Sequence, residues 1–220
     1  PSWQPIVQNY SARDYAAGTQ NWQLIEEDNG WIYIANNQGL LEYDGCSWHL
    51  YGLWHSSPLR SIAKGPGDAL YVGGLNEFGV FEPDASGKMT YRSLMDSLPD
   101  AYRTFGEIWK IHCDDDIVYL QTRHYIFIYD QDGHVDVIDP AAIIYSSLVQ
   151  GHCLYLATSN GLFLYSGKRL HTLSGGNTLA GLTVSAMEPY DAHSFLIGTD
   201  FSGIFLYDGS SLRTFPPSVD

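Results

Sequence analysis

Residues 21–45 read NWQLIEEDNGWIYIANNQGLLEYDG, and this stretch decides the fold. Apolar and polar residues alternate in short runs, as in half-buried β-strands. The runs are separated by 28–30, 36–39 and 44–45, which are rich in Asn, Asp and Gly. These residues tolerate the positive φ angles of tight turns. The stretch therefore predicts consecutive antiparallel strands joined by hairpin turns.

The same pattern returns along the chain. The segment Tyr33-Ile34-Ala35 is repeated after 38, 48, 36 and 41 residues, at 71–73, 119–121, 155–157 and, more loosely, 196–198. A second aromatic strand segment follows each copy. A period near ~40 residues with four short strands per unit is typical of propeller blades. The predicted fold is an all-β propeller of four-stranded antiparallel blades, with about five blades at 21–53, 58–94, 106–140, 145–174 and 180–217.

The rest of the chain frames this repeat. Residues 1–20 lie outside it and are expected to form an N-terminal arm or, through 5–10, a strand that closes the ring. Residues 21–220 are the propeller, and its longest linker, 95–105, is expected to hold a short helical turn. Three arrangements of the five blades stay open. They form a closed five-bladed ring, belong to a larger ring, or are a fragment that pairs its edge strands with those of another chain. Because unpaired edges favour association, we expect a homodimer or weak oligomer.

Charge and hydropathy exclude several partners. Lysine and arginine total 11 against 25 acids, a formal charge of −14. Such a surface repels phosphate backbones and anionic lipids, so this chain is expected to bind neither nucleic acid nor membranes. No apolar run approaches the ~18 residues of a membrane span. With no initiator Met or signal peptide, a processed protein or an excised piece is expected.

Several segments resemble a known family. Residues 25–40 are similar to the repeat of the two-component regulator propeller family. The segments 9–11, 17–22, 76–79 and 105–109 resemble the N-terminal sensor regions of Bacteroides-type hybrid two-component or triple-tyrosine regulators. The resemblance implies a periplasmic domain that senses a nutrient, often a glycan fragment, without catalysis. Family rings commonly have about seven blades, and this chain lacks the triple-tyrosine, membrane and output modules, so it shows no signalling output.

Propellers bind ligands at the mouth of the central channel, which is built from the loops between blades and between middle strands. Aromatic side chains beside Arg, Asn and Glu suit a sugar, because they offer flat apolar faces and planar hydrogen-bonding groups. Phe78 and Trp109 are expected in the core because of their alternating strand positions. Arg60 and Glu107 fit an ion pair between blades equally well. The predicted ligand-binding residues are Trp54, Arg60, Asn76, Glu77, Arg103, Glu107, Arg123 and His124.

Two other functions stay open: a glycoside hydrolase or lyase using acids such as Glu77 and Glu107, and a scaffold for protein partners.

No cofactor and no metal are expected. Adjacent strand residues point to opposite faces, so neither His112-Cys113 nor 152–153 offers both side chains to one ion. The three cysteines are expected to be free thiols, with a Cys113–Cys153 bridge as the alternative.

Overall fold

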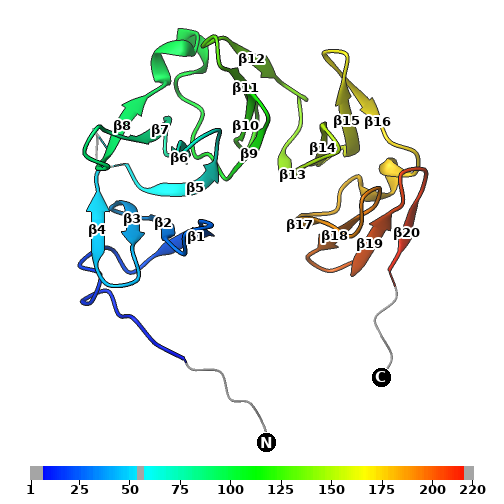
Figure 1. Cartoon of the computed structure of the whole chain (residues 1–220). Helices are drawn as coiled ribbons and strands as arrows, with labels where there is room; N and C mark the ends of the chain where they lie inside the picture. Colours follow the sequence, from blue (N-terminus) through cyan, green and yellow to red (C-terminus); the bar gives the residue numbers. More distant parts are fainter. Residues whose placement is uncertain (1–6, 54–56, 216–220) are drawn as a thin grey trace, which may run out of the picture.

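The computed structural model describes residues 7–53 and 57–215, and in them the chain forms five sheets of four antiparallel strands. The predicted all-β propeller fold is therefore confirmed (Figure 1). Each sheet is a meander, because neighbouring strands are consecutive in the chain. Antiparallel strands that follow one another can be joined by tight turns, which is what the glycine-rich connections provide.

The strands of the five blades are as follows. Blade 1 contains β1 (Asn21–Glu26), β2 (Ile32–Asn36), β3 (Gly39–Tyr43) and β4 (Trp48–Tyr51). Blade 2 contains β5 (Leu59–Lys64), β6 (Leu70–Gly74), β7 (Glu77–Pro83) and β8 (Met89–Ser93). Blade 3 contains β9 (Lys110–Asp114), β10 (Ile117–Gln121), β11 (Ile126–Asp130) and β12 (Val135–Ile138). Blade 4 contains β13 (Ile144–Gln150), β14 (Cys153–Thr158), β15 (Gly161–Ser166) and β16 (Arg169–Thr172). Blade 5 contains β17 (Val184–Pro189), β18 (Phe195–Thr199), β19 (Ile204–Tyr207) and β20 (Leu212–Thr214).

Three short 3₁₀ helices lie in the linkers. The expected helical turn of the 95–105 linker is present as η1 (Met95–Ser97) and η2 (Asp100–Tyr102). The third, η3 (Gly176–Leu179), joins blades 4 and 5. None of the helices in the described ranges is long and apolar enough to span a membrane.

The blades form an open arc. Their first strands, β1, β5, β9, β13 and β17, line the inside of the arc, and each contacts the next (Figure 1). The core is divided among the blade interfaces: one apolar cluster lies between each pair of consecutive blades. Among the described residues no such cluster joins blade 5 to blade 1.

The middle strands of blades 1–4 are apolar on both faces, because blades 2–4 pack between two neighbouring blades and blade 1 packs between the arm and blade 2. In β2, Tyr33 and Ala35 pack with blade 2, whereas Ile34 faces the other way. Sheets covered on both faces lose the simple apolar–polar alternation of a one-sided sheet. This explains the aromatic and aliphatic runs that recur in the sequence.

Residues 7–20 cover the free face of blade 1. Tyr15 is 8% exposed and packs with Ile34 and Leu41, and Tyr10 packs edge-to-face with Trp48 at 5.3 Å between ring centroids. The segment contains no strand within 7–20, so it is a docked arm there. The first two residues of the expected strand at 5–10 lie outside the described residues.

Candidate functional site

The first strand of a blade carries a register irregularity at its beginning. In blades 1, 2, 4 and 5 the pairing with the second strand shifts between the first and third residues of the inner strand. A bulge of this kind leaves one residue outside the ladder and redirects its side chain. In these four blades the skipped residues are Trp22, Arg60, Tyr145 and Ser185. In blade 3, Trp109 holds the corresponding place directly before β9, and its amide donates to the carbonyl of Gln121 at 2.8 Å.

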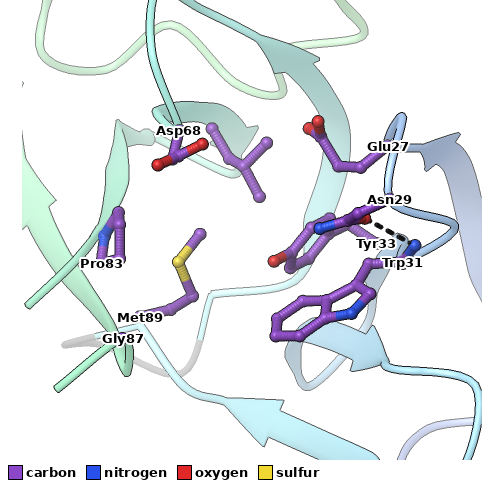
Figure 2. Close-up of a pocket in the computed structure, with 9 residues that line it drawn as sticks. Glu27, Asn29, Trp31, Tyr33, Asp68, Pro83, Gly87 and Met89 are labelled. Atoms are coloured by element: carbon purple, nitrogen blue, oxygen red, sulfur yellow. Dashed lines mark hydrogen bonds between the residues drawn. The ribbon is translucent and has the colours of Figure 1, made fainter.

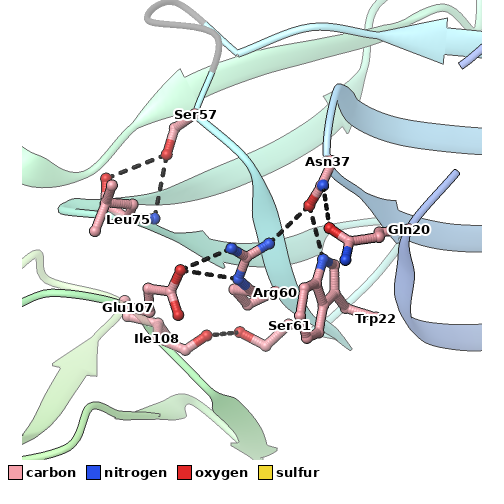
Figure 3. Close-up of polar contacts among 9 residues, drawn as sticks. All are labelled: Gln20, Trp22, Asn37, Ser57, Arg60, Ser61, Leu75, Glu107 and Ile108. Atoms are coloured by element: carbon pink, nitrogen blue, oxygen red, sulfur yellow. Dashed lines mark hydrogen bonds and ion pairs between the residues drawn. The ribbon is translucent and has the colours of Figure 1, made fainter. Parts of the chain in front are cut away.

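These five residues gather at one end of the inner strands, and three of them meet where blades 1–3 join. The Arg60 guanidinium contacts Glu107 through Nε (3.0 Å) and Nη2 (2.8 Å), both to Oε1. Its Nη1 donates to Oδ1 of Asn37 at 2.8 Å, and its Cζ lies 4.1 Å from the ring centroid of Trp22 (Figure 3). Arg60 therefore ties three blades together, and the alternative of a structural ion pair with Glu107 is confirmed.

The indole of Trp22 is fixed from both sides. Its Nε1 donates to Oδ1 of Asn37 at 2.8 Å, and Nδ2 of Asn37 donates to Oε1 of Gln20 at 2.6 Å (Figure 3). The ring packs edge-to-face with Trp109, with 6.3 Å between centroids and 72° between planes. Trp22 stays 42% exposed and Trp109 46% exposed. Two large aromatic rings are thus held rigidly at the mouth while keeping part of their surface in solvent.

A half-exposed leucine lies beside Glu107, the ion-pair partner of Arg60. Leu75 is 47% exposed and follows β6, where it forms an isolated bridge with Glu107. Ser57 fixes its backbone, because the Ser57 hydroxyl lies 3.1 Å from both the amide and the carbonyl of Leu75 (Figure 3). We call Trp22 and Trp109 the aromatic platform. Its exposed apolar surface beside polar groups is the composition of a ligand-binding surface.

A cavity of about 280 Å³ adjoins the platform on the inner strands of blades 3–5. Nζ of Lys110 lies 4.0 Å from Oε1 of Glu188 across it. Burial lowers the pKa of Lys110, and the charge of Glu188 partly opposes this shift. The cavity is lined by Trp109, Lys110, Gln121, Tyr145, Ser146, Ser185, Ala186 and Glu188. The cavity offers hydrogen-bond donors and acceptors, a cation, a carboxylate and an aromatic wall. Such a lining suits a polyhydroxylated molecule.

A buried polar chain lies behind this cavity. Ser147 Oγ donates to Oε1 of Gln121 at 2.6 Å and lies 2.9 Å from Nε2 of His112. Burial, with a smaller contribution from the charge of Lys110, lowers the pKa of His112 to about 4. His112 is therefore neutral at pH 7, and it supports the cavity wall without lining it.

The predicted ligand-binding residues do not lie together in the structure. Glu107 lies beside the platform but is paired with Arg60, and Trp54 lies outside the described residues. Arg103, on the linker after blade 2, pairs with Asp100 at 3.3 Å. Arg123 and His124 are exposed on the turn between β10 and β11.

Glu77 and Asn76 hold the fold of blade 2. Glu77 is 7% exposed and accepts hydrogen bonds from Tyr91 (2.7 Å) and Ser93 (2.6 Å) on β8, the outer strand. Asn76 has a left-handed φ of 49°, and its Oδ1 accepts from the amides of Phe105 (2.9 Å) and Gly106 (2.7 Å). The Glu77 carboxylate and Oδ1 of Asn76 are thus engaged by hydrogen bonds within the protein.

Phe78 and Trp109 were both expected in the core, but their environments differ. Phe78 is fully buried, as expected, whereas Trp109 is 46% exposed, so its core assignment is wrong. The physical reason is its place directly before β9, which corresponds to the bulged position of the other inner strands and leaves Trp109 outside the strand. Trp22, Leu75, Lys110, Tyr145 and Glu188 are absent from the predicted set. Trp22 and Tyr145 are both the second residue of an inner strand. Comparing this position between the repeats would have identified them.

A second hollow, of about 200 Å³, lies at the opposite end of blades 1 and 2 (Figure 2). Its walls are the turns that begin at Glu27, Gly65 and Asp84, with Trp31 on one side. Oδ1 of Asn29 accepts from the Trp31 amide at 2.9 Å, which is a local turn contact. The hollow is the space between two blade ends, and its polar groups serve the turns around it.

Other titratable groups gather on exposed turns. Asp114 and Asp115 lie near His152, with Nδ1 of His152 2.9 Å from Asp114, and a second set comprises Asp130, Asp132 and His134. Their carboxylates and imidazoles contact one another or turn amides. The three cysteines are free, as expected, so the alternative of a Cys113–Cys153 bridge is wrong.

Comparisons with known proteins agree on the fold. No family model matches the chain, and no curated protein sequence matches it. The extracellular domain of the proposed hybrid two-component system BT3049 from B. thetaiotaomicron superposes with a TM-score of 0.71 and 16% identity, over 100% of this chain and 31% of that one. The extracellular domain of the proposed one-component system BT4673 from the same organism gives 0.67 and 20% identity, over 88% of this chain and 27% of that one.

An enzyme has the same architecture. Virginiamycin B lyase from Staphylococcus aureus superposes with a TM-score of 0.65 and 13% identity, over 90% of this chain and 70% of the lyase. At these identities the likeness shows a shared propeller fold, which hosts both binding and catalysis. The chain spans less than a third of the length of the two B. thetaiotaomicron proteins.

Proposed function

We propose that this chain is the ligand-binding propeller of a bacterial signalling regulator, acting outside the cytoplasmic membrane, and that it binds a glycan fragment on the aromatic platform. The observation that carries the proposal is the pair of half-exposed, rigidly held indoles of Trp22 and Trp109 at the channel mouth. Sugars bind through their apolar faces to such rings and through their hydroxyls to neighbouring polar groups. The resemblance to extracellular domains of proposed two-component systems supports the signalling context.

The neighbouring cavity complements the platform. A sugar ring stacked on Trp109 would place its hydroxyls near Lys110, Gln121 and Glu188, which line the same space. Because the platform is fixed by Asn37 and Arg60, little side-chain entropy is lost on binding. The propeller is then a preorganised receptor, and no catalytic group is required.

The hydrolase or lyase alternative has less support among its nominated acids. Glu77 is enclosed in blade 2 and Glu107 is paired with Arg60. A glycosidase needs one carboxyl to donate a proton and the other to act as nucleophile or base. Neither group is free for that role. The scaffold alternative shares the same mouth and differs only in its ligand.

Titration with a panel of plant and host oligosaccharides tests the proposal. For a sugar that binds, Trp22→Ala and Trp109→Ala should each weaken affinity about tenfold, or ~1.4 kcal/mol. Phe201→Ala is the control, because that ring is 99% exposed at another position. Unchanged affinity in both tryptophan variants would remove the platform from the binding site. Release of product would support the enzyme alternative, and no binding across the panel would favour the scaffold.

Arg60 gives a second readout on the same samples. Its side chain is 13% exposed and that of Glu107 is 21% exposed. Arg60→Ala should therefore destabilise the fold by about 1.5–3 kcal/mol, the range for a hydrogen bond to a charged group. Arg92→Ala is the matched control: its pair with Glu82, at 3.2 Å, is exposed and should contribute about 0–1 kcal/mol. If thermal melting showed equal losses for both variants, Arg60 would not join the blades as described.

A further inference from the structure

The ammonium group of Lys110 lies in the cavity beside Trp109 without a close counter-charge. Lys110 begins β9, and its side chain is 31% exposed. Among the described residues, the one carboxylate oxygen within 4.0 Å of Nζ is Oε1 of Glu188, and it lies at that limit, beyond hydrogen-bond distance. Burial lowers the pKa of Lys110 more than the charge of Glu188 raises it. The cation has thus lost hydration that Glu188 does not replace.

The carboxylate of Glu188 is itself mostly hydrated. Its side chain is 69% exposed, and exposed ion pairs contribute little because water screens them. A second lysine shows the contrast: Nζ of Lys168 lies 3.0 Å from Oδ2 of Asp136, although the Lys168 side chain is 81% exposed. The more enclosed lysine therefore has the more distant acid. An anion can reach Nζ of Lys110 while Glu188 stays in water.

Two further donors line the same cavity. Gln121 is 2% exposed, and its Oε1 already accepts from the hydroxyl of Ser147 at 2.6 Å. Its Nε2 carries two hydrogens, and within the described ranges its one hydrogen bond is to the carbonyl of Tyr145 at 3.4 Å, close to the limit of such a contact. Ser146, which is 6% exposed, adds a hydroxyl. A cation, an amide and a hydroxyl together favour a ligand group that accepts hydrogen bonds and carries negative charge.

We propose, building on the proposed function, that the glycan fragment is acidic, and that a carboxylate or sulfate group on the sugar binds Lys110 while the sugar ring stacks on Trp109. Both residues line the same cavity of about 280 Å³. The anion replaces the long contact with Glu188 by a charge-assisted hydrogen bond, which is stronger than a bond between neutral groups. The negative group of the ligand then selects among sugars that the aromatic platform alone would accept.

Two matched pairs of glycans test this and distinguish the two anions. The first pair is tetragalacturonate and its carboxyl-reduced form, and the second is 6-sulfated N-acetyllactosamine and its unsulfated form. They are titrated calorimetrically together with the oligosaccharide panel. In at least one pair the acidic member should bind about tenfold or more tightly than its neutral counterpart, because it gains a hydrogen bond to a charged group. The pair that shows the difference identifies carboxylate or sulfate.

Variants of the two charged residues assign the effect to the cavity. Lys110→Met keeps the apolar stem and should weaken binding of the acidic glycan about tenfold or more, while changing that of its neutral counterpart less than about twofold. Glu188→Gln should strengthen binding of the acidic glycan about two- to fivefold, because it removes a competing carboxylate. Lys168→Met is the matched control, because it changes the net charge equally at an exposed turn and should leave affinity as it is. The melting temperature of Lys110→Met should not fall, because the variant removes a poorly hydrated cation.

The outcomes separate this inference from the proposed function. If Lys110→Met weakened the acidic and the neutral glycan equally, or if only neutral glycans bound, the acidic ligand would be wrong and the platform would still stand. If binding depended on Lys110 but not on Trp22 or Trp109, the anion site would stand and the platform would be wrong. If neither the panel nor the matched pairs bound, both would be overturned.

Discussion

Trp22 and Arg60 show how little of the site depends on residue type alone. Both occupy the bulged position of an inner strand, and so do Tyr145 and Ser185. The bulge aims each side chain at the mouth, and the residue then decides the role. Trp22 keeps an exposed face, whereas the guanidinium of Arg60 is paired with Glu107 and Asn37. The same backbone position therefore holds a half-exposed ring in blade 1 and a contact between blades in blade 2.

His112 should make stability depend on pH. Burial lowers its pKa from 6.5 to about 4, so in the unfolded chain it takes up a proton at higher pH than in the folded chain. Stability should therefore be complete above about pH 6.5 and fall as the pH drops toward 4, because the unfolded state then binds more protons. The melting temperature between pH 4 and 7 measures this slope, and His112→Gln should reduce it.

The pH dependence due to His112 can be separated from that of an exposed histidine and of the carboxylates. His134→Gln, at an exposed turn, should leave the slope as it is. Hydrogen bonds to turn groups lower the pKa of Asp44, Asp84 and Asp208, the last to about 2. Stability that depends on these lowered carboxyl pKa values is lost only as pH falls below about 4. An unchanged slope in His112→Gln between pH 4 and 6.5 would contradict the assignment.

At the scale of the element, the third strands of blades 1 and 4 begin at a position that needs glycine. Gly39 has a φ of 138°, and a Cβ there would collide with the carbonyl oxygen of Tyr51. Gly161, with φ at 117°, meets the carbonyl of Gly176 in the corresponding way. The backbone of the link to the next blade thus runs directly over this position, which leaves no room for a side chain.

Gly39→Ala should therefore destabilise blade 1 by at least about 1–2 kcal/mol, from the strained φ alone. The collision with Tyr51 adds to this. Gly52→Ala is the control, because no atom lies within 4 Å of a Cβ at that site and its φ is not positive. Chemical denaturation of the two variants measures the difference. Equal midpoints would mean that the chain relaxes around Gly39 without loss.

At the scale of the whole molecule, the two ends of the arc should differ in local stability. Blade 1 is covered by residues 7–20 on one side and by blade 2 on the other, whereas among the described residues blade 5 packs against blade 4 alone. In repeat architectures a terminal unit without its neighbour unfolds at lower free energy. Amides in β18 and β19 should therefore exchange faster than those in β2 and β3.

Native-state hydrogen exchange of the full chain measures this directly. Blade 3, which has neighbours on both sides, provides the internal reference. Equal protection of blades 1, 3 and 5 would show that the face of blade 5 around Ile204, which is 47% exposed, is covered in solution. Sedimentation at the same concentration would then identify self-association, which the sequence analysis also expects.

Repeats and turns were sufficient to predict the fold. The recurrence of Tyr33-Ile34-Ala35 and the Asn, Asp and Gly turns depend on neighbours a few residues apart, and a sequence displays such periodicity directly. The short helical turns at 95–105 follow from similarly local chemistry. The ion pair of Arg60 with Glu107 could be expected, because Arg60 lies at the start of the inner strand of blade 2 and Glu107 lies shortly before that of blade 3.

Only the tertiary structure decided which side chains face the mouth. Shifting a strand by one residue exchanges its two faces, and neither the bulge at Trp22 nor the start of β9 just after Trp109 leaves a local mark in the sequence. Glu77 and Trp109 illustrate the consequence: the acid is enclosed by Tyr91 and Ser93, while the indole is half-exposed. The exposure of Ile204 was equally hidden, because burial at a blade face depends on which sheet comes next, and this is a property of the assembled arc rather than of the strand.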